Sequence, residues 1–206
     1  HGHTGVFIDG TTVSSRLPIP DEPTPAMRRL MKRFGLDPAD FEGRVLDVRA
    51  ALQEARRRRG PELGYDYDRL SDDELTDIVQ FNFFPNTMIT LQPDEALMMR
   101  SRPHPDDPNR CWWDKLTFVM EPRVEGTDPP PPRERPVHDE FTQDDIISGE
   151  KTMTITIDQD IHLIRDVQAG MRSSGFDTAL LSDEEIRVTH YHQWLDHHVG
   201  ELGHER

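Results

Sequence analysis

The stretch FNFFPNTMITLQPDEALMM, residues 81–99, decides the fold, because the helical spacing of the preceding residues changes here to a strand pattern. It predicts two β-strands separated by a break at Gln92–Glu95. A third strand is expected over Cys111–Met120, after a turn at Pro105–Asn109. Residues 1–23 predict one or two further strands and a loop. Consecutive strands joined by short polar turns predict an antiparallel meander.

Helical spacing precedes and follows these strands. One helix is expected from Thr24, with a break at Gly35–Pro38, and a second over residues 38–58. Two more helices are expected near residues 158–174 and 183–199. A sheet with helices collected at one end is an α+β fold, and no glycine-rich phosphate loop follows any strand. The pattern therefore excludes a doubly wound nucleotide-binding fold.

The chain length suits one compact domain over residues 1–206. Residues 121–139 interrupt it, because the run Pro129–Pro132 cannot lie in a helix or a central strand. We therefore expect 121–139 to be an exposed, proline-rich loop. The arginine run Arg56–Arg59 is expected to be a solvated helix end rather than a binding patch.

Charge and cysteine content exclude several classes of protein. The formal net charge of −15 disfavours binding to nucleic acid and to anionic membranes. Cys111 is the only cysteine, so no internal disulfide can form. No apolar run approaches the roughly 18 residues of a membrane span, and no secretory signal is visible. A reducing cytoplasm is the expected location.

Asp160 is the most informative candidate for chemistry. At about 100° per residue, it shares a helix face with Ile164, Val167 and Met171. A carboxylate on an apolar face is costly unless it is neutralised, hydrogen-bonded or bound to a metal. The alternative is that Asp160 caps the first turn of its helix, a role that Asp158 could also take.

The segment around Asp160 resembles a known family. QDIHLIRDVQAGMRSSGF, residues 159–176, is similar to a stretch of Rieske-type ring-hydroxylating oxygenase large subunits that reads Glu-Asp and then Val-Gln-x-Gly-x-x-Ser. Gln159 replaces the glutamate. Phe83–Asn86 is similar to the family's Phe-Pro-Asn stretch, Arg102–Arg110 to the hairpin after it, and Ser182–Trp194 to its last helix. The resemblance covers residues 80–206 convincingly and residues 24–70 only in general character.

The resemblance implies a helix-grip fold (START-like, SRPBCC), in which a curved antiparallel sheet surrounds the long helix 158–174. It implies an oxygenase that activates O₂ at mononuclear Fe(II) to hydroxylate an aromatic or other small organic substrate. In the family, the aspartate at position 160 is the carboxylate of a two-histidine, one-carboxylate iron site. The favoured alignment makes His1 a second iron ligand, and His3 is the less favoured choice. That both are surface histidines at the start of a strand stays an open alternative.

A Rieske [2Fe–2S] cluster needs two cysteines and two histidines, so this chain with Cys111 alone cannot hold one. We therefore expect a catalytic domain that lacks its Rieske domain and is inactive by itself. The resemblance also implies electrons from NAD(P)H through a reductase and/or a ferredoxin, and a homotrimer. It leaves a small β subunit open. Asn86 and Phe84 are candidates for the substrate pocket. A simple turn role explains Asn86 at least equally well, and a place in the core explains Phe84 better.

Two other classes of function are alternatives for this sequence. The first is a non-catalytic protein that binds a small ligand on the same helix-grip scaffold. The second is a copper site made by the amine and imidazole of His1 with His3, as in secreted enzymes with an amino-terminal histidine. Such enzymes usually contain disulfides, and Cys111 alone speaks against them. The identity of the substrate does not follow from the sequence.

Overall fold

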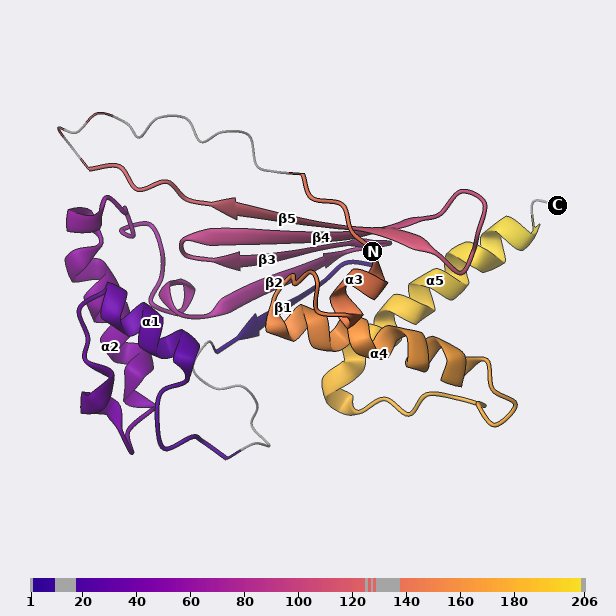
Figure 1. Cartoon of the computed structure of the whole chain (residues 1–206), viewed down its shortest axis with the longest axis horizontal. Coiled ribbons are helices and arrows are strands. Elements are labelled where there is room, and N and C mark those ends of the chain that lie inside the picture. The colour runs from indigo at the N-terminus through magenta and orange to yellow at the C-terminus, as the bar shows by residue number, and fades with distance from the viewer. Residues whose placement is uncertain (1, 10–17, 125, 127, 129–137, 205–206) are drawn as a thin grey trace. The chain divides into compact units, whose positions relative to one another are not determined.

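The structure is a computed structural model, and it describes residues 2–9, 18–124, 126, 128 and 138–204 (Figure 1). The chain divides into two compact units. The sheet unit comprises His1–Pro129 and Glu184–Arg206, and the α4 unit comprises Pro130–Asp183.

The sheet unit contains five antiparallel strands in the order β1-β2-β3-β4-β5 (Figure 1). The strands are β1 (Thr4–Ile8), β2 (Ile78–Phe83), β3 (Thr87–Gln92), β4 (Glu95–Pro103) and β5 (Cys111–Val119). The register brings Phe81, Ile89, Met98 and Leu116 into one row across four strands. Residues in one row point to the same face, so these four side chains form an apolar row on one face of the sheet. The predicted antiparallel meander and the α+β class are confirmed.

Residues 81–99 form parts of three strands rather than the two that we expected. A turn at residues 84–86 separates β2 from β3, and a second turn at residues 93–94 separates β3 from β4. The backbone N–H of Ser101 donates to the carbonyl of Asn86 (3.1 Å), and the Asn86 side-chain amide donates to the carbonyl of Ser101 (2.8 Å). The first turn escaped prediction because it begins with an aromatic residue.

Two helices in the sheet unit form a small core of their own. They are α1 (Pro25–Arg33) and α2 (Asp47–Arg59). Thr24 caps α1 by accepting a hydrogen bond from Met27 N (3.3 Å), with Pro25 in the first turn as predicted. The core comprises fully or almost fully buried Met31, Phe34, Val48, Leu52 and Leu75.

The second helix starts later than the predicted residue 38. Pro38–Phe41 forms only a 3-10 turn, and Gly43 follows with a φ of 70°. A backbone in this left-handed region cannot continue a right-handed helix. Helix α2 therefore begins at Asp47. Two more 3-10 turns, Pro61–Leu63 and Asp73–Leu75, lie between α2 and β2.

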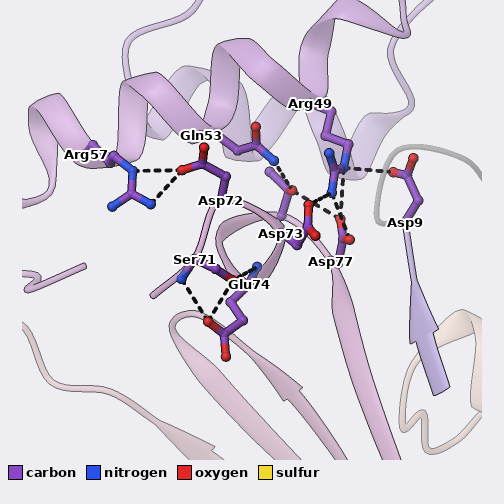
Figure 2. Close-up of polar contacts among 10 residues, drawn as sticks. Asp9, Arg49, Gln53, Arg57, Ser71, Asp72, Asp73, Glu74 and Asp77 are labelled. Atoms are coloured by element: carbon purple, nitrogen blue, oxygen red, sulfur yellow. Dashed lines mark hydrogen bonds and ion pairs between the residues drawn. The ribbon is translucent and has the colours of Figure 1, made fainter. Parts of the chain in front are cut away.

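Arg49 fastens α2 to one end of the sheet (Figure 2). Its guanidinium donates to both carboxylate oxygens of Asp77 (3.0 and 2.9 Å) and to Asp73 (2.6 Å). It also forms an ion pair with Asp9 at 3.8 Å. Asp77 directly precedes β2 and Asp9 directly follows β1, so one side chain joins a helix to two strands. We call these four residues the Arg49 cluster.

The arginine run at the end of α2 is not simply a solvated helix end. Arg56 is 4% exposed, and its guanidinium lies 3.4 Å from the carboxylate of Asp94 in the β3–β4 turn. The expectation for Arg56 is therefore wrong. Arg57 pairs with Asp72 and Arg58 with Glu54. Arg57 and Arg58 thus make ion pairs within the chain.

The described part of the α4 unit includes the helices α3 (Gln143–Ile147) and α4 (Ile155–Met171). Ile146 on α3 and Ile157 and Ile161 on α4 are buried. The Gln143 side-chain amide donates to the carbonyl of Ile161 (2.8 Å). This contact fixes which side of α4 faces α3.

The last helix, α5 (Ile186–His204), belongs to the sheet unit and follows a 3-10 turn at Asp183–Glu185. Of the predicted loop 121–139, residues 121–124, 126, 128, 138 and 139 are exposed and carry no helix or strand. The Pro129–Pro132 run lies outside the described residues.

Candidate metal centre

Asp158, not Asp160, supports the start of α4. Its carboxylate accepts hydrogen bonds from Met153 N (2.9 Å) and from the hydroxyl of Thr152 (2.5 Å). These two hydrogen bonds, that of Thr152 first, lower the pKa of Asp158. Thr154 completes the cap by accepting from Ile157 N (3.4 Å). Asp160 is therefore not needed as a cap of this helix.

Asp160 lies in the second turn of α4 with its side chain exposed. Its carboxylate makes no hydrogen bond or ion pair with any other residue that the structure describes. The expectation that its face is buried is wrong, because Ile164, Val167 and Met171 are each about half exposed. Ile157 lies seven residues before Ile164 on nearly the same side of α4, so burial covers the first two turns, at Ile157 and Ile161, and ends before Ile164. The carboxylate of Asp160 thus has no partner among the described residues, and exposed apolar side chains flank it.

His3 is held just before β1. Its Nδ1 accepts a hydrogen bond from Phe84 N (3.1 Å), and its ring lies 5.8 Å from that of Phe83. A neutral imidazole that accepts at Nδ1 carries its proton on Nε2. Neither nitrogen then offers a lone pair to a metal, so this geometry disfavours His3 as a ligand. His1, the favoured candidate, lies outside the described residues.

Phe84, a candidate for the substrate pocket, lies at the opposite end of the sheet from the Arg49 cluster. Its half-buried ring lies 5.5 Å from that of Tyr191 and 5.2 Å from that of His198, both on α5. A Cβ added to buried Gly2 would come within 2.8 Å of Phe84 Cγ. Asn86, the other candidate, uses its side chain on Ser101 as described above. Both residues thus have defined structural contacts.

Sequence reasoning missed the part that Tyr191 plays in this region. Its hydroxyl donates to the carbonyl of Pro85 (3.0 Å), which links α5 to the β2–β3 turn across more than a hundred residues of sequence. Helical spacing places Tyr191 on a stripe with Val188 and Val199, but it carries no signal for the partner. This contact could be found only in three dimensions.

The described residues do not form a complete metal site. Among them, no three histidine, cysteine, aspartate or glutamate side chains gather closely enough to hold a metal ion. Asp160 has the chemistry of an iron ligand and no competing partner, whereas His3 is engaged. A two-histidine, one-carboxylate site would therefore need ligands from beyond the described residues.

Comparison with protein families identifies the class of protein. Residues 25–201 match the family described as ring hydroxylating alpha subunit (catalytic domain). The match spans most of the chain and includes both units, so the protein belongs to this family of oxygenase subunits. Comparisons with curated proteins and with solved structures found no match. Within the described residues, no helix has the length and apolar character that crossing a membrane requires.

Proposed function

We propose that this chain is the catalytic portion of a Rieske non-haem iron oxygenase that uses O₂ to hydroxylate an aromatic or other small organic substrate. Membership of the ring hydroxylating alpha subunit family supports the oxygenase class. The observation that carries the iron assignment is the contrast between two neighbouring carboxylates. Asp158 is fully occupied at the helix start, while Asp160 is exposed and unpaired among the described residues.

Asp160 and His1 are the proposed iron ligands, and His3 is less favoured because of its hydrogen bond to Phe84. Ferrous iron, when bound by two histidines and one carboxylate, supplies O₂ activation at its open positions. The role of Asp160 in this proposal is electrostatic. An anionic oxygen ligand stabilises a divalent cation, and the exposed position of Asp160 lets it act without first breaking a contact with another described residue.

Electrons are proposed to arrive from outside this chain. A Rieske [2Fe–2S] cluster needs two cysteines, and the sequence has only Cys111. We therefore propose that a cluster on a separate domain relays electrons from NAD(P)H, delivered by a reductase, a ferredoxin or both. The chain by itself is then inactive. A homotrimer in the cytoplasm, with or without a small β subunit, completes the proposal.

Phe84 and Asn86 stay predictions for the substrate-binding region. Their contacts with Tyr191 and Ser101 favour a part in holding the β2–β3 turn over direct recognition of a substrate. Truncation of Asn86 to alanine tests this. A change in KM among related substrates supports recognition, whereas an equal loss of activity towards all of them supports a role in the turn.

The test of function is substrate-dependent O₂ uptake by the native full-length protein with its reductase. Asp160→Ala is compared with Asp166→Ala, which removes an exposed carboxylate elsewhere on the same helix. We expect Asp160→Ala to reduce uptake at least about 100-fold, since loss of a residue that only hydrogen-bonds to a metal ligand already costs about 10–100-fold. Asp166→Ala should retain the O₂ uptake. Full turnover in Asp160→Ala would overturn the ligand assignment, and absence of uptake and iron in the unmodified protein would favour a non-catalytic ligand-binding protein.

A further inference from the structure

The residues just before β1 pack against the β2–β3 turn, and the last helix contacts the same turn. Phe84 N donates to His3 Nδ1 (3.1 Å), and Gly2 lies so close to the Phe84 ring that no Cβ fits. Tyr191 and His198 of α5 also contact the Phe84 ring. All of these residues belong to the sheet unit.

The contacts differ in how they restrain the turn. The hydroxyl of Tyr191 holds the backbone at Pro85 through a directed hydrogen bond of 3.0 Å. His198 stacks on Phe84 with an angle of 25° between the rings, so it limits how far that ring can move towards α5. Both contacts therefore restrain Phe84 and Pro85, the residues against which Gly2 and His3 pack.

We propose that α5 is a positioning element for the segment Gly2–His3, acting through the β2–β3 turn, with Tyr191 and His198 as the positioning residues. The inference rests on the proposed function only in its last step, which concerns His1. Because His1 adjoins Gly2 in sequence, a fixed Gly2 would restrict the positions that His1 can take as a metal ligand. Tyr191 and His198 would in this way influence a ligand at His1 through Gly2–His3.

The first test is amide hydrogen exchange over residues 2–8 of the native full-length protein. Tyr191→Phe keeps the ring and removes only the hydroxyl. We expect about five-fold faster exchange in this segment, corresponding to one lost hydrogen bond of about 1 kcal/mol. Gly2→Ala, which disturbs the same packing from the other side, should also speed exchange. Gln193→Ala, at an exposed position between these contacts on α5, should not.

The second measurement separates this proposal from the proposed function. The half-life of bound iron in the presence of a chelator is compared among the same variants, with the denaturation midpoint as a check on global stability. Faster exchange together with faster iron loss supports both the positioning role and a ligand at His1. Faster exchange with unchanged iron loss supports the positioning role and removes His1 from the ligand set. Unchanged exchange in Tyr191→Phe overturns the positioning role, whatever the iron does.

Discussion

Arg49 and Asp77 form a two-pronged ion pair, in which Nε lies 3.0 Å from one carboxylate oxygen and Nη2 lies 2.9 Å from the other (Figure 2). Asp77 is 8% exposed and directly precedes β2. Hydrogen bonds to Asp77 and then to Asp73 raise the pKa of Arg49. The pair satisfies a buried carboxylate and joins the helices of the sheet unit to its strands.

Removal of the Arg49 side chain should therefore destabilise the sheet unit. Arg49→Met leaves Asp77 buried without its cation, and we expect the free energy of unfolding to fall by about 2–3 kcal/mol in urea denaturation. Arg49→Lys keeps the charge but loses the paired geometry, so it should lie in between. Arg44→Met, which removes an exposed pair with Asp47, should change stability by less than about 1 kcal/mol. Equal effects of Arg49→Met and Arg44→Met would contradict this role.

Tyr67 should make stability depend on alkaline pH. Burial, followed by its hydrogen bond to Asp94, raises the pKa of Tyr67 above that of an ordinary tyrosine, about 10. Above pH 10 the unfolded chain loses this proton while the folded chain keeps it. The stabilisation is therefore complete below about pH 10 and is lost as pH rises further.

Urea midpoints measured from pH 8.5 to 11 test the tyrosine prediction. Tyr67→Phe should be less stable at pH 8.5, because Asp94 loses a buried donor, by about 1 kcal/mol. It should also fall less steeply with pH than the unmodified protein. The same slope in both proteins would show that Tyr67 is not the group responsible.

Gly64 should tolerate alanine less well than Gly43. Both have positive φ, 82° and 70°, so each alanine costs about 1 kcal/mol of backbone strain. A Cβ on Gly64 would also lie 2.7 Å from Arg123 N, which donates to the Gly64 carbonyl, whereas Gly43 has open space. We expect Gly64→Ala to lose about 1–3 kcal/mol more than Gly43→Ala in chemical denaturation. Equal losses would mean that the contact with Arg123 is not close.

Substitutions of Asp158 and of Asp160, both on α4, should have different effects on stability. Asp158→Ala removes the acceptor for Thr152 and Met153, so it should lower the helix content and thermal midpoint of the α4 unit. Because the pKa of Asp158 is lowered in the folded chain, its contribution is present above about pH 4 and is lost as pH falls. Asp160→Ala should leave the thermal midpoint of the metal-free protein unchanged. A large loss of stability in metal-free Asp160→Ala would indicate a structural carboxylate instead.

Local patterns predicted much of the fold. The strands after residue 87 and the capped start at Thr24 follow from alternation, proline position and capping chemistry. The turn at residues 84–86 was missed because it begins with Phe84, which continues the apolar run of β2. The buried state of Arg56 depends on Asp94, thirty-eight residues away. Such long-range pairs leave no periodic trace in the sequence.

The candidate site was predictable only in part. Spacing placed Asp160 with Ile164 and Val167 on one face of a helix, and the helix forms. Spacing could not tell how far along α4 the burial extends, and the structure buries Ile157 and Ile161 but leaves Ile164 exposed. The family resemblance named Asp160 as the candidate ligand, and the hydrogen bonds of Asp158 show that Asp160 is not needed at the helix start. The contact between Tyr191 and Pro85 had no sequence signal at all.

Iron stoichiometry tests the central claim most directly. The native full-length protein, Asp160→Ala and Asp166→Ala are loaded with Fe(II) without oxygen, passed through a desalting column and assayed for iron and for acid-labile sulfide. Sulfide counts the Rieske cluster separately from the mononuclear site. The proposal predicts that Asp160→Ala keeps its cluster and loses the mononuclear iron, whereas Asp166→Ala keeps both. Full retention of mononuclear iron by Asp160→Ala would contradict it.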